Sequence, residues 1–199
     1  MLSLVSPVLG FTGPALAPAR APIAATMRAE GEIGVTPPLG VYDPLNLLAE
    51  PVTYPRRDYR RYVELEIKHG RIAMLATLGV ITTEAGFRWP GYLSKSLDLK
   101  FADVPGGCFD SYNAVPALGW LQIVGFVIFL ELAFGATDPS KEPGDIGGPS
   151  WVRYDDPETK KRKLNIERNN GRAAMMGILG MMTHNALGVD ALFPIVGGN

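Results

Sequence analysis

The chain has 199 residues, a formal net charge of −1 and 47% hydrophobic residues. The near-neutral charge argues against nucleic acid as a partner. Cys108 is the single cysteine, which excludes an intrachain disulfide and a cluster of thiolate metal ligands.

The N-terminal stretch has the composition of an organelle-targeting segment. Residues 1–28 contain two arginines, no aspartate or glutamate, and much alanine, proline, serine and threonine. We therefore expect residues 1–30 to be a targeting segment or a flexible N-terminus, and residues 31–199 to form the functional domain. That domain begins with a proline- and glycine-rich stretch up to Pro55, which is typical of an extended arm.

Three long helices are predicted after the arm. They run from about Asp58 to Glu84, from about Pro116 to Gly135, and from near Lys160 to Leu187 or Gly188. The connections between them are rich in proline and glycine and are expected to be loops. Helices of about 20 residues match the hydrocarbon thickness of a bilayer, although none of these three is an uninterrupted apolar run.

The distribution of basic residues favours three membrane spans. Eight arginines and lysines lie in the flanks before the first and third helices, whereas the loop between the first and second helices contains three. With three spans, both basic flanks lie on one side of the membrane, as the positive-inside rule requires. The expected fold class is therefore an all-α membrane protein with three transmembrane helices, the first and third of which are parallel.

The first and third helices carry two copies of one motif. Residues 66–82 align without a gap with the stretch 101 residues later, with eight identities in seventeen positions, which indicates a repeated structural unit. Within each copy the glutamate and the arginine lie about 140° apart around a helix, so the glutamate is poorly placed to neutralise its own arginine. A two-fold axis between parallel copies would instead pair Glu66 with Arg172 and Glu167 with Arg71. The two helices are therefore expected to form a crossed pseudo-two-fold pair.

Small residues occupy matching positions in the two copies. Glycine or alanine occurs at 70, 73, 76 and 79, and again at 171, 174, 177 and 180. Such residues let helix backbones, or a flat ligand, approach closely. Because residues three apart drift by about 60° around a helix, we expect the first of them to form the helix crossing. The later ones are expected to form a floor for a planar or rod-like ligand.

Polar side chains of metal-binding types are spread along the predicted spans. Asn170 and His184 are fourteen residues apart, or about 21 Å of helix rise, and cannot bind one ion. Separate single ligands indicate separate metals whose other coordination positions are filled by something other than protein. A magnesium held in a tetrapyrrole ring, which needs one axial donor from the protein, fits this pattern.

The two segments of the form Glu-x-x-His/Asn-x-Arg-x-Ala-Met resemble the chlorophyll-binding motif of the three-helix light-harvesting complex superfamily. The first copy reads Glu-Ile-Lys-His-Gly-Arg-Ile-Ala-Met-Leu, and the following loop contains Gly-Tyr-Leu-Ser and Lys-Phe-Ala-Asp-Val-Pro-Gly-Gly. These sequences are similar to those of the chlorophyll a/c branch, which comprises the fucoxanthin- or peridinin-binding antennae of red-lineage algae. The loop sequence resembles that of dinoflagellate members. The resemblance covers Val41 to Leu187.

The resemblance implies a set of axial ligands to chlorophyll magnesium. Glu66 and Glu167 would each bind one magnesium through one carboxylate oxygen, while the other oxygen meets the partner arginine. In the green-lineage pattern the central-helix ligands are eight residues apart; here they are nine apart, and no arginine follows the glutamate by three residues. The central glutamine could equally bond across helices, and the histidines could be core residues. The remaining implied ligands are His69, Asn170, His184, Gln122 and Glu131.

The function that the resemblance implies is that of a light-harvesting antenna in the plastid thylakoid membrane. It would be a multi-pass protein and not an enzyme, binding chlorophyll a, chlorophyll c, a peridinin- or fucoxanthin-type carotenoid and a xanthophyll. It would pass excitation energy to a photosystem. The implied partners are a photosystem core, neighbouring antenna proteins and thylakoid lipids.

Two alternatives stay open. A photoprotective member of the same family would dissipate excitation and would use protonatable carboxylates such as Asp98, Asp103 and Asp110. A carboxylate-bridged di-iron oxidase also uses the spacing of Glu66 and His69. That enzyme needs the pair twice, and the second copy of the motif has an asparagine instead of a histidine.

Overall fold

The structure is a computed structural model that describes residues 31–45, 59–134, 141–146 and 153–192. In these ranges three long helices dominate, α2 (Tyr59–Glu84), α4 (Ala117–Phe134) and α5 (Pro157–Ala186). The connection from α2 to α4 is itself folded. It contains a short antiparallel hairpin of β1 (Tyr92–Ser94) and β2 (Leu99–Lys100), a 3₁₀ turn at Phe101–Asp103 and the short helix α3 (Cys108–Ala114).

The long helices lie where the sequence predicted them, to within a few residues. Helix α5 begins earlier than expected because Asp156 caps it, its carboxylate accepting a hydrogen bond from the Thr159 N–H at 2.9 Å. The next residue, Pro157, suits the first turn of a helix. The hairpin and α3 fall in a stretch predicted to be loop, because elements of two to seven residues are too short to show a hydrophobic period.

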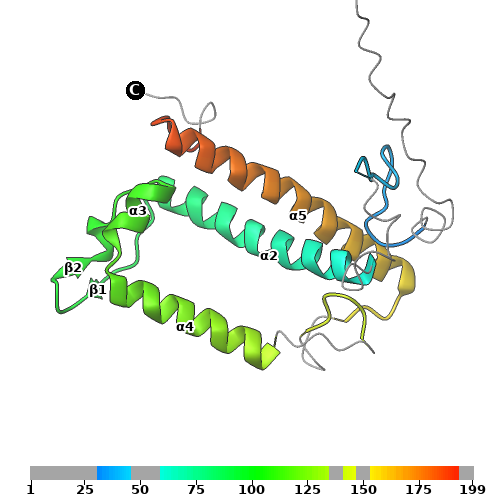
Figure 1. Cartoon of the computed structure of the whole chain (residues 1–199), viewed down its shortest axis with the longest axis horizontal. Helices are drawn as coiled ribbons and strands as arrows, with labels where there is room; N and C mark the ends of the chain where they lie inside the picture. The colour runs from blue at the N-terminus through cyan, green and yellow to red at the C-terminus, as the bar shows by residue number, and fades with distance from the viewer. Residues whose placement is uncertain (1–30, 46–58, 135–140, 147–152, 193–199) are drawn as a thin grey trace, which may run out of the picture.

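Helices α2 and α5 pack along each other, whereas α4 lies beside them with sparse contacts (Figure 1). The ends of the packed pair meet at the beginning of α3. The Gly107 N–H donates to Glu84 Oε1 at 2.7 Å, and the Phe109 N–H donates to Asn185 Oδ1 at 3.0 Å. Because Glu84 ends α2 and Asn185 lies in the last turn of α5, the two helices run in the same direction, as predicted for the first and third helices.

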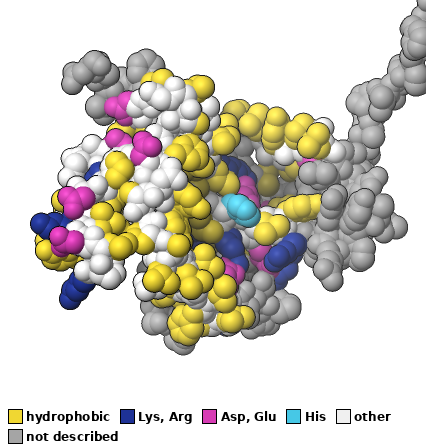
Figure 2. Space-filling view, turned by 60° about the vertical axis from the view of Figure 1, so that its left-hand side comes forward, with side chains coloured by type: hydrophobic (Ala, Val, Ile, Leu, Met, Phe, Trp, Pro, Cys, Tyr) yellow, Lys and Arg dark blue, Asp and Glu magenta, His cyan; other side chains and the backbone are white. Residues whose placement is uncertain are grey.

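Few side chains are buried by this arrangement. In the described ranges the buried hydrophobic residues are Val63, Ala73 and Ala191, and no residue of α4 from Ala117 to Ala133 is buried. Large apolar side chains lie on the surface instead, and hydrophobic groups cover much of the face shown in Figure 2. Apolar surface of this extent is typical of proteins that contact apolar partners. None of the described helices alone has the length and apolarity of a membrane span, and the bent pair of α3 and α4 is the one combination that does.

Candidate functional site

The crossing of α2 and α5 is built on one glycine from each copy of the repeat. Gly70 and Gly171 are buried, and a Cβ added to either would lie 3.0 Å from the Cα of the other. Farther along the helices, a Cβ added to Gly79 or Gly180 would meet nothing within 4 Å. The predicted crossing at the first small residues is thus confirmed. The helix surface at Gly79 and Gly180 is open, and the floor for a flat ligand stays a prediction.

At this crossing the two helices exchange ion pairs. Arg71 Nε donates to Glu167 Oε1 at 2.7 Å, and Arg172 Nε donates to Glu66 Oε1 at 2.6 Å. The two glutamate side chains are 30% and 26% exposed. The structure thus brings together both pairs predicted from the repeat, and each carboxylate is held by the arginine of the other helix through a charge-assisted hydrogen bond.

Glu66 has a second arginine partner that the sequence analysis missed. Arg168 Nη1 donates to Glu66 Oε2 at 3.1 Å and to the carbonyl of Ile33 at 3.2 Å, and the Arg168 side chain is only 8% exposed. In the repeat Arg168 aligns with Ile67, and this difference between the copies was the available signal. Across the described ranges no hydrogen bond reaches Oε2 of Glu167. The two glutamates therefore differ in their contacts: among the described residues, Glu66 has both carboxylate oxygens bonded and Glu167 has one.

Each arginine of the reciprocal pairs also binds the extended segment that precedes the opposite helix. Arg172 Nη1 donates to the Gly34 carbonyl at 2.7 Å, and Arg71 Nη1 donates to the Gly144 carbonyl at 2.8 Å. Both glycines have positive φ, +96° and +85°, a conformation that glycine adopts without strain. Sequence analysis missed these contacts. A signal existed in a shorter repeat, Gly-Glu-Ile-Gly ending at Gly34 and Gly-Asp-Ile-Gly beginning at Gly144, although the two arginines use different glycines of it.

Each glutamate also lines a cavity between the helix pair and one of these segments. The cavity beside Glu66 has a volume of about 690 Å³ and is bounded by residues 33–42 and the start of α2. The cavity beside Glu167 has a volume of about 440 Å³ and is bounded by residues 142–145 and the start of α5. The pseudo-two-fold relation therefore extends from the ion pairs to the space beside the carboxylates.

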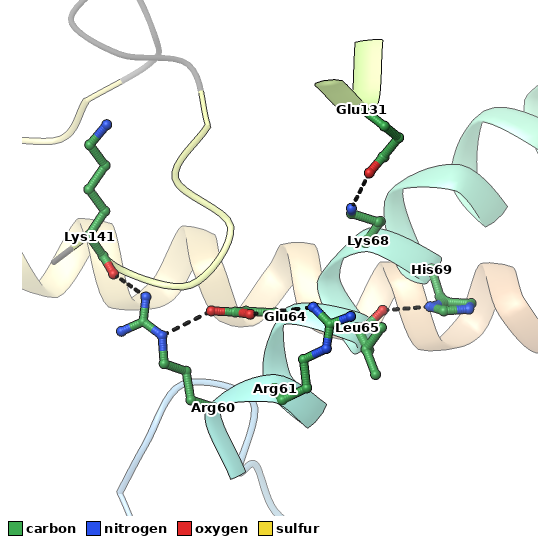
Figure 3. Close-up of polar contacts among 8 residues, drawn as sticks. All are labelled: Arg60, Arg61, Glu64, Leu65, Lys68, His69, Glu131 and Lys141. Carbon is green, nitrogen blue, oxygen red and sulfur yellow. Dashed lines mark hydrogen bonds and ion pairs between the residues drawn. The ribbon is translucent and has the colours of Figure 1, made fainter. Parts of the chain in front are cut away.

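His69 lies on the exposed side of α2, three residues after Glu66. Its Nδ1 atom is 2.7 Å from the carbonyl oxygen of Leu65 in the preceding turn (Figure 3). Because a carbonyl only accepts, Nδ1 carries the proton, and Nε2 of the neutral ring keeps its lone pair. A histidine that binds a metal commonly donates its other N–H to a backbone carbonyl. The donor chemistry at His69 therefore fits an axial ligand.

The remaining predicted ligands are dispersed along the helices. Asn170 is exposed beside the crossing, and His184 lies in the last turn of the same helix, about 21 Å farther along. Gln122 and Glu131 are exposed on α4, and Glu131 Oε2 accepts a hydrogen bond from Lys68 Nζ at 2.7 Å (Figure 3). In the part of the chain that the structure describes, no three His, Cys, Asp or Glu side chains could jointly hold a metal ion. Such dispersion suits separate sites with one protein donor each.

Known proteins show extended similarity to this chain. The sequence profile of the family described as chlorophyll A-B binding protein matches residues 29–186, which include both copies of the repeat. The chain is 48% identical over 184 residues to fucoxanthin-chlorophyll a-c binding protein F, chloroplastic, of Macrocystis pyrifera, covering 89% of this chain and 84% of that protein. It is 45% identical over 185 residues to fucoxanthin-chlorophyll a-c binding protein B, chloroplastic, of Phaeodactylum tricornutum, covering 90% of each. It is 42% identical over 212 residues to the fucoxanthin-chlorophyll a-c binding protein, chloroplastic, of Trieres chinensis, covering 97% of each.

Proposed function

The chain belongs to the chlorophyll A-B binding protein family, and from this premise we propose how its own residues hold pigment. It is a chloroplast light-harvesting antenna protein that binds chlorophylls a and c and fucoxanthin-type carotenoids, and it is not an enzyme. Antenna proteins of this family associate with photosystems. The di-iron oxidase alternative is therefore wrong, and the fucoxanthin-chlorophyll relatives do not favour the photoprotective alternative.

Glu167 and His69 are the ligands that the contacts support best. Arg71 holds Oε1 of Glu167 and neutralises its charge, while Oε2 has no partner among the described residues. A carboxylate oxygen is a donor that magnesium prefers. Leu65 holds the His69 ring by Nδ1 and leaves Nε2 as the donor atom. At Glu66, a magnesium would have to share Oε2 with Arg168.

The other ligands in the proposal rest on the chemistry of their side chains and on their dispersion. Each would supply one oxygen or nitrogen donor to the magnesium of one chlorophyll. When bound, the chlorophylls absorb light and pass the excitation to neighbouring pigments. The protein's part is to set the distance and orientation between them. The ligands proposed on these grounds are Asn170, His184, Gln122 and Glu131.

The proposed setting is the thylakoid membrane, with α2, α4 and α5 as three spans. The exposed apolar side chains on all three helices support this arrangement. The parallel direction of α2 and α5 also supports it, because it places both basic flanks on one side of the membrane. Thylakoid lipids, a photosystem core and neighbouring antenna proteins would cover the apolar surface. The pigment-binding domain would comprise residues 31–199, and the targeting segment proposed at 1–30 lies outside the described residues.

The observation that carries the proposal is the pair of reciprocal ion pairs at the crossing, each of which neutralises a carboxylate beside a cavity. To test it, the full chain is refolded in detergent with chlorophyll a, chlorophyll c and fucoxanthin, and the isolated complex is analysed by chromatography of its extracted pigments. We expect a reproducible number of chlorophylls per polypeptide and chlorophyll a emission on excitation of fucoxanthin. Failure to retain pigment, or a carotenoid whose excitation does not reach chlorophyll, would overturn the proposal.

A further inference from the structure

Helix α4 carries one charged residue. Within Ala117–Phe134 every side chain is apolar or neutral except Glu131. Near its start, α4 is joined to α3 by a hydrogen bond from Trp120 Nε1 to the Tyr112 carbonyl at 3.1 Å. A lone carboxylate on a helix this apolar is costly unless a partner neutralises it.

The partner comes from α2. Lys68 Nζ donates to Glu131 Oε2 at 2.7 Å (Figure 3), and the two side chains are 45% and 52% exposed. Contacts of α4 with the packed pair are otherwise sparse. Lys68 lies next to His69 and two residues after Glu66. In the repeat it aligns with Asn169 of α5, so the lysine occurs in the copy that contacts α4 and is absent from the other.

The contact also follows the rule seen at the helix crossing. Glu66 and Glu167 are each neutralised by a cation from the opposite helix rather than from their own. Helix α4 has no arginine or lysine, and the cation for Glu131 likewise comes from another helix. In each case a second helix supplies the charge that lets a carboxylate remain ionised in apolar surroundings.

We propose that Lys68 is the positioning residue of a chlorophyll site on α4. It neutralises Glu131 through Oε2 and leaves Oε1, which has no partner among the described residues, as the magnesium donor. The inference rests on the proposed function, because it takes Glu131 to be a ligand. It assigns to a lysine of α2 the role that a cation within α4 would otherwise have. Tethering of α4 by the same ion pair is the competing explanation, and the two tests below separate it from ligation.

The first test compares two exposed lysines after refolding with chlorophyll a, chlorophyll c and fucoxanthin. Lys68→Leu should lose one chlorophyll per polypeptide relative to the unmodified chain, whereas Lys68→Arg should retain it. The control is Lys95→Leu, because Lys95 is an exposed lysine between β1 and β2 and lines neither of the two cavities. An unchanged chlorophyll number in Lys68→Leu would overturn the proposal, and so would an equal loss in the control.

The second test separates ligation from tethering. Exchanging the charges, Lys68→Glu with Glu131→Lys, restores an ion pair but places an ammonium, which has no lone pair, at the ligand position. We expect this double variant to assemble with one chlorophyll fewer, and a full complement would show that Glu131 is no ligand.

A third variant keeps the proposal testable if Lys68→Leu does not assemble. The double variant Lys68→Leu with Glu131→Gln should then assemble better than Lys68→Leu, since a neutral amide needs no cation. Equal failure of both would overturn the proposal. Loss of all pigment by the unmodified chain would contradict the proposed function instead.

Discussion

Arg71 and Arg172 occupy equivalent positions in the repeat, but replacing Arg71 should be the more damaging change. Arg71→Leu leaves Glu167 without a cation within hydrogen-bond distance among the described residues. Arg172→Leu leaves Glu66 bonded to Arg168 at 3.1 Å. Both changes also remove one bond to a glycine carbonyl, at 2.8 and 2.7 Å, so those losses nearly cancel in the comparison.

The expected difference follows from how far each ion pair is buried. Removing one partner of a buried pair costs about 3–5 kcal/mol, whereas an exposed pair contributes about 0–1 kcal/mol. Arg71 and Glu167 are 25% and 30% exposed, so Arg71→Leu should cost roughly 2–4 kcal/mol. Since Arg168 keeps the charge of Glu66 neutralised, Arg172→Leu should cost roughly 1–2 kcal/mol. A difference of about 1.4 kcal/mol between the two variants would correspond to a tenfold difference in the equilibrium constant of unfolding.

The assay is the yield and the thermal or denaturant midpoint of the pigment-bound protein after refolding. Adding Arg168→Ile to Arg172→Leu should lower both readouts to the level of Arg71→Leu, because isoleucine is the residue aligned with Arg168 in the first copy. Equal losses from Arg71→Leu and Arg172→Leu would refute the reasoning. So would a double variant no worse than Arg172→Leu alone.

Neutralising the orphaned carboxylate tests the cross-helix geometry itself. Glu167→Gln should partly rescue Arg71→Leu, since the amide removes the uncompensated charge that the lost arginine leaves behind. The control is Glu66→Gln with Arg71→Leu, which changes the same residue types within one helix and leaves Glu167 ionised. If the control assembles as well as the cross-helix double variant, the reciprocal pairing does not operate in the folded protein.

Three further outcomes are expected. Gly70→Ala should lower the yield of refolded protein, because its Cβ would lie 3.0 Å from a backbone atom and overpacking costs about 1–3 kcal/mol. In Gly79→Ala the new Cβ lies in open space, so this variant should leave the helix crossing undisturbed. Cross-linking of α2 to α5 would show whether the crossing is kept. His184→Leu should remove one chlorophyll from the pigment extract and leave assembly intact, since no reciprocal pair at the crossing includes it. Hydrogen bonds from Arg153 at 2.7 and 3.0 Å hold the pKa of Asp145 below its usual range. The stabilising effect of this ion pair is therefore present above the ordinary aspartate pKa and is lost as the pH falls through the lowered pKa. Residues 141–146 should become sensitive to protease in that low pH range, and in Asp145→Asn their protease sensitivity should not change with pH.

The sequence predicted the helix pair because the repeat encodes both partners of each contact. A glutamate and an arginine that cannot reach each other on one helix imply a second helix, and the second copy of the motif supplies it. The small residue at the same position in both copies then identified the crossing, where Gly70 and Gly171 approach. These inferences needed only helix geometry and the cost of burying charge.

Contacts with the connecting segments could not be predicted in the same way. The carbonyls of Gly34 and Gly144 are reached only after the arm and the loop fold back onto the helices. Nothing in the local period of either segment indicates which arginine it meets. The pairing of Lys68 with Glu131 likewise depends on where α4 lies, and α4 has no repeat partner against which its position could be inferred.

The positions where the two copies differ in charge are therefore informative about asymmetry in the fold. Ile67 and Arg168 align, and each packs against the glycine of the opposite extended segment: a Cβ on Gly144 would meet the Ile67 side chain at 3.0 Å, and a Cβ on Gly34 would meet Arg168 Nη1 at 2.8 Å. The contact is the same in kind, but on one side it is apolar and on the other it brings a second cation to a carboxylate. Arg168 bonds Oε2 of Glu66, whereas the equivalent oxygen of Glu167 has no partner among the described residues. A difference of one side chain therefore makes the two glutamates unequal as the proposed magnesium ligands, while both reciprocal ion pairs at the crossing are kept.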